Sequence, residues 1–303
     1  PEHLDYHKTY ENYVMTKMKL LQKSKVSVIN KDDASYKLIS NIKNEISKIH
    51  SKNKKWVTYG IKNNADINPK NFPFKTSLIG DFNKYNVLAA VAACRELGIS
   101  DQIIREAILT FKPPIGREEI VYPSAGSGQV NFTVMVDFAH TPNAFEEILS
   151  SIKPSIKGRL IHVFGSAGLR DASKRPLMGK ASAKYSDTII LTAEDPRSES
   201  VEKIMSEIAL GIQSSKFKMQ NDNSKLKIKD ARNVIFRIPD RQDAINAAIK
   251  MAKRGDFVLI TGKSHEKSMN YGKGEEPWDE FEAVKKALRS VIARSRRRRG
   301  NPV

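Results

Sequence analysis

The sequence has little cysteine and no long apolar run. Its one cysteine, Cys94, has no partner for an internal disulfide, and it lies in the run L-A-A-V-A-A-C, which is typical of a core segment. No stretch is apolar for long enough to span a bilayer, and no secretory signal peptide can be recognised. These absences exclude a disulfide-stapled domain and an integral membrane protein, and they favour a reducing cytoplasm.

Two further absences concern nucleotides and nucleic acids. The chain contains no G-x-x-x-x-G-K-[ST], the loop whose backbone amides hold nucleotide phosphates. It also shows no helix-turn-helix, zinc-finger spacing or paired aromatic strand signature, although its formal charge is +18. Part of that charge lies in residues 290–303, where the run R-S-R-R-R-R-G predicts a basic disordered tail that binds polyanions weakly. We therefore expect no specific nucleic-acid binding.

The 303 residues are enough for two domains of ordinary size, and the sequence changes character at Pro113–Pro114. We place the domain boundary at this dipeptide, because proline disfavours helix in the residue before it. Ahead of the boundary the pattern predicts a strand at V-S-V-I, a helix at Ala34–Ile49, a strand at Trp56–Ile61, a buried helix at Asn83–Gly98 and a helix at Ser100–Thr110.

Beyond the boundary, short β-rich runs alternate with amphipathic runs of helix length, which predicts an α/β domain with a mainly parallel sheet. The predicted strands are Thr133–Phe138, Leu160–Phe164, Thr188–Thr192, Val234–Ile238 and Phe257–Thr261. The predicted helices are Asn143–Ile152, Pro176–Tyr185, Val201–Ile212, Arg241–Lys253 and Trp278–Arg289. We interpret the lysine-rich stretch Ser214–Asp230 as a surface excursion.

Polar clusters follow four of these strands. They read D-F-A-H-T-P-N from Asp137, G-S-A-G-L-R-D from Gly165, A-E-D-P-R from Ala193 and G-K-S-H-E from Gly262. Because ligands bind outside the carboxyl ends of parallel strands, we expect the four clusters to meet at one edge of the sheet.

The cluster after Phe164 is suited to an anion. Gly165 and Gly168 allow backbone conformations that other residues resist. A helix starting at Pro176 would direct its unpaired N–H groups toward the loop. Fixed positive charge would come from Arg170, Lys174 and Arg175. A solvated charged turn is the alternative interpretation of the same residues.

A set of motifs occurs in order between about His3 and Leu288. They are H-L-D-Y-H-x-T-x-E-x-Y-x-x-x-K, F-N-x-Y-N-x-L-A-A, G-R-E-E, V-D-F-A-H-T-P-N-A, F-G-x-x-G-x-R-D-x-x-K-R-P-L-M-G, T-A-E-D-P-R-S-E and T-G-K-S-H-E. Together they resemble the Mur ligase family, and within it the UDP-N-acetylmuramyl-tripeptide synthetase branch.

The resemblance implies that residues 1–114 are the latter part of the family's central ATPase domain. Residues 115–289 would be a complete Rossmann-like carboxy-terminal domain, followed by the tail. The family's amino-terminal UDP-sugar domain and its phosphate-binding loop have no counterpart in this sequence. We therefore expect a truncated protein or gene fragment that is inactive on its own.

The resemblance also implies a monomeric, cytoplasmic amide ligase of peptidoglycan synthesis, and hence a role in cell-wall biogenesis, cell shape and cell division. It would use ATP and Mg²⁺ to join a diamino acid to UDP-N-acetylmuramyl-L-Ala-D-Glu through an acyl phosphate, whose charge needs cations around it. Three interpretations stay open beside it: an L-lysine-adding homologue, a folylpolyglutamate-synthetase-like ligase, and a non-catalytic Rossmann-like binding module whose basic tail binds an acidic partner.

By resemblance, Lys17 is the lysine that family members carbamylate to hold Mg²⁺, and His3 is the metal-binding histidine before it. Asn86 matches the asparagine at the adenine, with Asn83 as its companion. The other ATP contacts implied are Arg117 at the phosphates, Asp137 at the ribose hydroxyls and His140 near the nucleotide. Without the resemblance, Lys17 would be an exposed helical lysine, and the asparagines and the aspartate would be caps.

The implied amino-acid contacts lie in three of the polar clusters. Glu194, Asp195, Pro196 and Arg197 match the family's D-N-P-R loop, whose arginine pairs with the far carboxylate of meso-diaminopimelate. Arg170 matches the second arginine of the site, and Gly262 and Glu266 match contacts to the distal ammonium. Asp195 replaces the motif's asparagine, and its negative charge could favour lysine. We expect meso-diaminopimelate, with a paired Asp195 that orients Arg197.

Overall fold

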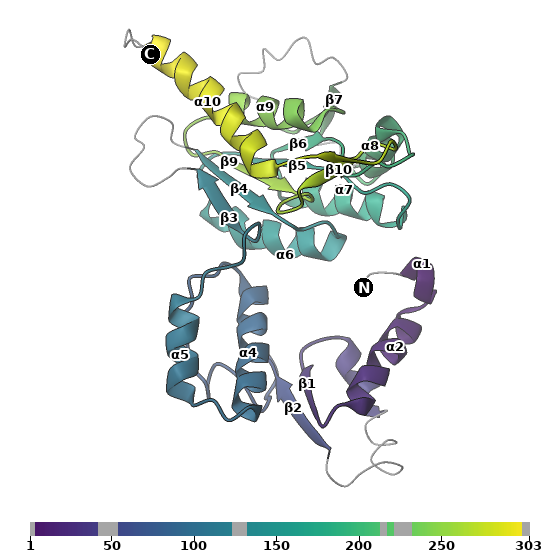
Figure 1. Cartoon of the computed structure of the whole chain (residues 1–303), viewed down its shortest axis with the longest axis vertical. Helices are drawn as coiled ribbons and strands as arrows, with labels where there is room; N and C mark the ends of the chain where they lie inside the picture. Colours follow the sequence, from purple (N-terminus) through teal and green to yellow (C-terminus); the bar gives the residue numbers. More distant parts are fainter. Residues whose placement is uncertain (1–3, 42–53, 123–131, 213–216, 221–231, 299–303) are drawn as a thin grey trace. The chain divides into compact units, whose positions relative to one another are not determined.

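The computed structural model describes residues 4–41, 54–122, 132–212, 217–220 and 232–298. The chain divides into two compact units, Pro1–Lys112 and Pro113–Val303, which we call the first and second units (Figure 1). The proline dipeptide at the start of the second unit lies at this division. Each unit has its own core, so each is described by itself.

The first unit combines helices with a two-stranded parallel sheet. Its elements are α1 (Leu4–His7), α2 (Tyr10–Lys23), β1 (Val26–Asn30), a helical segment at 35–41, β2 (Lys55–Tyr59), α4 (Asp81–Glu96) and α5 (Asp101–Thr110). One small core joins α2 to β1, and a second joins β2, α4 and α5 around the fully buried Phe72.

Helix α4 differs from the prediction of a helix that is buried on nearly all sides. It buries Val87, Leu88, Val91 and Ala92, but Ala90 and Ala93 are exposed. Alanine adds to an apolar sequence pattern, yet its single methyl group costs little when it faces water, so the pattern overstated the burial. The glycine stop is confirmed, because Gly98 has a φ of +79° and its N–H bonds to Arg95 O at 3.0 Å.

The second unit is built on a seven-stranded sheet in the order β3-β4-β9-β5-β6-β8-β7. The strands are β3 (Glu119–Tyr122), β4 (Thr133–Asp137), β5 (Leu160–Phe164), β6 (Thr188–Leu191), β7 (Lys218–Gln220), β8 (Val234–Arg237) and β9 (Phe257–Thr261). Strand β3 is antiparallel to β4, and the other pairs are parallel. The predicted α/β class with a mainly parallel sheet is confirmed.

Helices cover both faces of this sheet (Figure 1). One face packs against α6 (Pro142–Ile152), α7 (Lys174–Tyr185) and α8 (Val201–Leu210), and the other against α9 (Arg241–Met251) and α10 (Glu280–Arg298). Strand β4 shows the reason, since Val134 and Val136 face the second set of helices and Met135 faces the first. A sheet covered on both faces requires strands that are apolar throughout, which is the pattern in the sequence.

The structure adds elements that the sequence did not indicate. Besides the edge strand β3, it contains β7 within the stretch interpreted as a surface excursion, and an antiparallel hairpin of β10 (Ser268–Asn270) and β11 (Glu275–Pro277). No helix among the described residues is long and apolar enough to cross a membrane.

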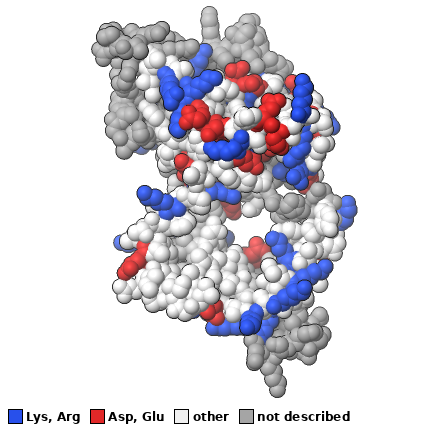
Figure 2. All heavy atoms as spheres, in the orientation of Figure 1, with Lys and Arg blue, Asp and Glu red and all other residues white. Residues whose placement is uncertain are grey.

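The prediction of a disordered tail at 290–303 is wrong for the residues up to Arg298, which continue α10. Val291 and Ile292 pack against the α9–α10 core, and arginine and alanine favour helix. Residues 299–303 lie outside the described part. On the face shown in Figure 2, acidic and basic side chains of the second unit lie side by side rather than in one basic patch.

Close contact between α7 and α8 generates a stability prediction at Gly211. A Cβ on this residue would lie 1.7 Å from the carbonyl oxygen of Pro176, so one helix must move away from the other. We expect Gly211→Ala to lower the free energy of unfolding by about 1–3 kcal/mol in urea titrations. The control is Leu210→Ala, whose side chain is 60% exposed. Equal stability of both variants would contradict the close packing.

Candidate functional site

The four polar clusters meet at the carboxyl edge of the second unit's sheet, as the sequence predicts. The loop after β9 is joined to the end of β4, since Gly262 N donates to Asp137 O at 3.3 Å. The loop after β5 is joined to the loop after β6, since Gly168 N donates to Asp195 O at 2.9 Å. Side chains from different strands are therefore held within reach of one ligand.

Strained backbone is concentrated in three of these loops and in the turn before β3. Non-glycine residues with positive φ here are Glu118 (48°), Leu169 (53°), Asp195 (43°), Arg197 (51°) and Ser264 (48°). Side chains resist this conformation, which persists only where surrounding contacts hold it and which is typical of ligand-binding sites. Only Lys8 and Asn233 share it elsewhere among the described residues.

The loop carrying Arg197 is clamped from two sides. The guanidinium donates from Nη1 to Gly168 O in the β5 loop, and Arg197 N donates to Asn270 O at 2.9 Å in the hairpin. The hairpin also approaches through Gly272, where a Cβ would lie 2.7 Å from Arg197 O. The position of the arginine is thus fixed by segments far away in the sequence.

Asp195 pairs with a lysine of the neighbouring loop. Both of its carboxylate oxygens lie 2.9 Å from Lys263 Nζ, and Oδ1 also accepts from Asn270 N at 2.9 Å. Lys263 Nζ lies 2.7 Å from Oε2 of Glu266 as well. The expectation that Asp195 orients Arg197 is therefore wrong, because the guanidinium bonds to a carbonyl and the carboxylate to an ammonium.

Glu194 is a buried acid at the centre of these loops. It is 7% exposed, and its Oε2 has no hydrogen-bond partner among the residues that the structure describes. Gly262 leaves room for it, since a Cβ there would lie 2.2 Å from Oε2. Burial raises the pKa of Glu194 to about 7, against the opposing effect of Arg241, Lys174 and Lys263.

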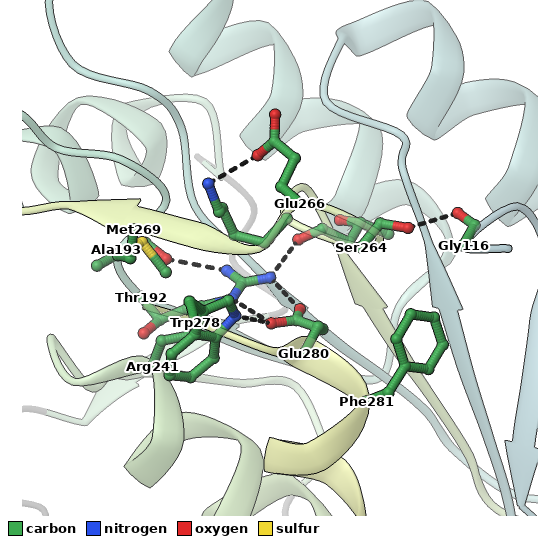
Figure 3. Close-up of polar contacts among 12 residues, drawn as sticks. Gly116, Thr192, Ala193, Arg241, Ser264, Glu266, Met269, Trp278, Glu280 and Phe281 are labelled. Carbon is green, nitrogen blue, oxygen red and sulfur yellow. Dashed lines mark hydrogen bonds and ion pairs between the residues drawn. The ribbon is translucent and has the colours of Figure 1, made fainter. Parts of the chain in front are cut away.

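Arg241 joins strand ends that the sheet leaves apart, because β5 lies between β6 and β9. Its guanidinium donates to Ala193 O at 2.9 Å after β6 (Figure 3). It also donates to Thr261 O at 2.8 Å on β9. Two further donors, Nε and Nη2, pair with Glu280, which also accepts from Trp278 Nε1 at 2.8 Å. Arg241 and Glu280 are both fully buried. The two carbonyls directly precede Glu194 and Gly262, so this pair positions both residues.

The residues expected near ATP in this unit gather around Phe138. The Cζ atom of Arg117 lies 4.6 Å from the centre of its ring, and the rings of His140 and His265 lie 4.9 and 4.8 Å away. Asp137 accepts from Ala139 N at 2.7 Å and from Glu118 N at 2.8 Å, so it shapes the turns on either side. A contact to ribose stays a prediction.

The loop after β5 and the start of α7 differ from the predicted anion-binding site. Helix α7 begins at Lys174 rather than Pro176, and Arg175 is fully buried between Glu199 and Glu207. Lys174 Nζ donates to His140 O at 3.0 Å. Arg175 is buried and Lys174 is half-buried, so only Arg170 of the predicted trio is exposed.

The first unit carries the other predicted residues. Lys17 is exposed, with Nζ 5.4 Å from the centre of the Tyr13 ring. Asn86 is exposed, and its Nδ2 donates to Oδ1 of the buried Asn83 at 3.3 Å. His3 lies outside the described residues. The described residues contain no group of three His, Cys, Asp or Glu side chains that could hold a metal ion.

Together, this sheet and its loops define an α/β domain of the class whose members bind ligands at the carboxyl ends of parallel strands. Comparison with known families is consistent with this class. Residues 116–264 match the Mur ligase, glutamate ligase domain, and residues 1–94 match the Mur ligase middle domain. The chain belongs to the Mur ligase family, whose members are ATP-dependent amide ligases.

Individual relatives agree with this assignment. The UDP-N-acetylmuramoyl-L-alanyl-D-glutamate–2,6-diaminopimelate ligase of Aquifex aeolicus (strain VF5) is 39% identical and aligns with 95% of this chain. The UDP-N-acetylmuramyl-tripeptide synthetase of Borrelia garinii subsp. bavariensis is 37% identical over 96% of the chain. A solved UDP-N-acetylmuramoyl-L-alanyl-D-glutamate–2,6-diaminopimelate ligase aligns with 95% of this chain and 58% of its own, at a TM-score of 0.53 and 28% identity. The chain spans 56% of the length of each of the first two relatives.

The Arg241–Glu280 pair generates a stability prediction. Arg241→Met would leave Glu280 charged and unpaired in the interior, so we expect a loss of about 3–5 kcal/mol in the free energy of unfolding. Arg241→Met/Glu280→Leu should lose less than the single variant, because the pair then leaves no unpaired charge behind. Arg254→Met, at an exposed position, is the control for urea unfolding. A loss below about 1 kcal/mol for Arg241→Met would contradict the role of the pair.

The raised pKa of Glu194 generates a pH prediction. In the folded chain the carboxyl holds its proton up to about pH 7, whereas the ordinary pKa is 4.5. Its stabilising effect is thus complete below pH 4.5 and is lost as the pH rises through 7. We expect Glu194→Gln, which does not titrate, to gain about 3 kcal/mol relative to wild type across this interval.

Urea unfolding of both chains at a series of pH values measures that difference. Burial lowers the pKa of His162 to about 3, but this histidine is present in both chains and its effect cancels. A difference that does not change with pH would show that Glu194 titrates normally.

Proposed function

We propose that this chain forms the amino-acid-binding part of an acid–amino-acid ligase of the tripeptide-synthetase type. The whole enzyme would join meso-diaminopimelate to UDP-N-acetylmuramyl-L-Ala-D-Glu in the cytoplasm, through an acyl phosphate made with ATP. The observation that carries the proposal is the loop of Glu194, Asp195, Pro196 and Arg197, which is clamped between the β5 loop and the β10–β11 hairpin. Such fixed positions preorganise a site for its ligand.

Each residue of the edge then has a role toward the amino acid. Arg197 offers its planar pair of donors to the far carboxylate, and the exposed Arg170 supplies a second cation. Glu266, whose side chain is 41% exposed, accepts from the distal ammonium. Gly262, which makes room for the carboxylate of Glu194, is the proposed backbone contact to the same end of the ligand. Glu194 is buried beside Gly262.

For ATP we propose Asn83 and Asn86 at the adenine, and Arg117, Asp137 and His140 at the ribose and phosphates. Asn86 in the first unit and Arg117 in the second are each exposed to solvent. Arg117 is also supported by the Phe138 ring beneath its guanidinium. Negative charge develops at the phosphates during transfer. The positive charge of Arg117 would therefore stabilise the transition state.

For Mg²⁺ we propose Lys17 and His3 as ligands. Lys17 is exposed, so its amine is accessible to carbon dioxide for carbamylation. The described residues nevertheless offer no cluster of three metal-binding side chains, and His3 lies outside them. We also propose that residues 1–114 are part of a Mur ligase central domain and that residues 115–289 are a Mur ligase carboxy-terminal domain.

The test joins the amino-terminal part of the Aquifex relative to this chain and measures phosphate release. With ATP, the UDP-muramyl dipeptide and either diamino acid, we expect turnover by the chimera and preference for meso-diaminopimelate. The chain alone should show no ligase-like turnover, because it contains no G-x-x-x-x-G-K-[ST].

Variants of the chimera test the role of Arg197. Arg197→Ala should lower kcat/KM for meso-diaminopimelate by about 30-fold or more, because the far carboxylate loses a charge-assisted pair. Arg254→Ala, at an exposed basic position away from the four loops, should have no effect. Preference for L-lysine together with an unchanged kcat/KM in Arg197→Ala would overturn the assignment.

A further inference from the structure

Lys263 is a buried cation between two acids of the proposed amino-acid site. Its side chain is 2% exposed, and its Nζ lies 2.9 Å from each carboxylate oxygen of Asp195 and 2.7 Å from Oε2 of Glu266. An ammonium has three N–H donors, and these three contacts use all of them. Lys263 follows β9 and Asp195 follows β6, so the pair joins strands that do not neighbour each other.

The three partners differ in their access to water. The side chains of Asp195 and Glu266 are 18% and 41% exposed, whereas Lys263 cannot reach the solvent. A buried ammonium must stay paired, because an unpaired charge in the interior is costly. Glu266 is therefore the partner that can turn toward a ligand, while Asp195 remains with Lys263.

We infer that Lys263 determines which diamino acid this edge accepts, by neutralising the carboxylate of Asp195. The inference rests on the proposed function. With Asp195 neutralised, the far end of the ligand meets the guanidinium of Arg197 and the carboxylate of Glu266. This pair of charges complements the carboxylate and ammonium at the far end of meso-diaminopimelate.

Without Lys263, no cation would compensate the negative charge of Asp195. Asp195 would present an unpaired carboxylate beside Arg197, where it would repel the far carboxylate of meso-diaminopimelate. L-lysine carries only an ammonium at its far end, so the same carboxylate would attract it. If Lys263 only connected the two loops, its loss would instead weaken the binding of both amino acids equally.

The experiment is a calorimetric titration of the full chain with meso-diaminopimelate and with L-lysine. The measured quantity is the ratio of the two dissociation constants, diaminopimelate over lysine. In Lys263→Met we expect this ratio to rise by about tenfold or more, and in Lys263→Arg, which keeps the charge, to stay near the wild-type value. Adding Asp195→Asn to Lys263→Met should restore the ratio, because the unpaired carboxylate is gone.

Asp195→Asn alone keeps the test decisive if Lys263→Met fails to fold. It removes one negative charge beside Arg197 while Lys263 stays paired with Glu266, so the ratio should fall below that of wild type. An unchanged ratio in Lys263→Met or Asp195→Asn, with both ligands still bound, would overturn the role of Lys263 and leave the proposed function standing. Wild-type chain that binds neither amino acid would overturn the proposed function, and this inference with it.

Discussion

The carboxyl edge of the second unit depends on the buried ion pair of Arg241 and Glu280. The ladder of the sheet fixes neighbouring strands relative to each other, but β6 and β9 are separated by β5. One guanidinium spans this gap because its planar fork directs donors at two carbonyls and a carboxylate simultaneously. The loops that begin at these carbonyls carry the residues of the proposed site, so their spacing follows from one side chain.

Charge is distributed differently in the core and at this edge. The two apolar clusters cover the faces of the sheet, whereas Glu194, Lys263, Arg241 and Glu280 are buried together where the strands end. Burying these charges is costly even when they are paired, and replacing such pairs with apolar side chains often stabilises a protein. Their concentration beside strained backbone therefore points to binding rather than to stability.

The sequence predicts the second unit well because its signals are local. The strands, the helices and the polar clusters at the strand ends each follow from a short run of residues, and the structure contains all of them. Pairs such as Lys263 with Asp195 join distant loops, so no local pattern indicates them. Burial of Arg175 was missed for the same reason, since Glu199 and Glu207 come from a later segment. Short elements such as β7 and β10 depend on their neighbours, so their own sequences did not reveal them.

The central claim is that loops from β5, β6 and β9 form one amino-acid site. Backbone amide spectra of the ¹⁵N-labelled chain, recorded during titration with meso-diaminopimelate, test it most directly. Our account predicts that shifts concentrate in residues 165–170, 193–198 and 262–272, and that they saturate together with one dissociation constant. Shifts confined to the first unit or to α10, or saturation at different concentrations in the three loops, would contradict a single site.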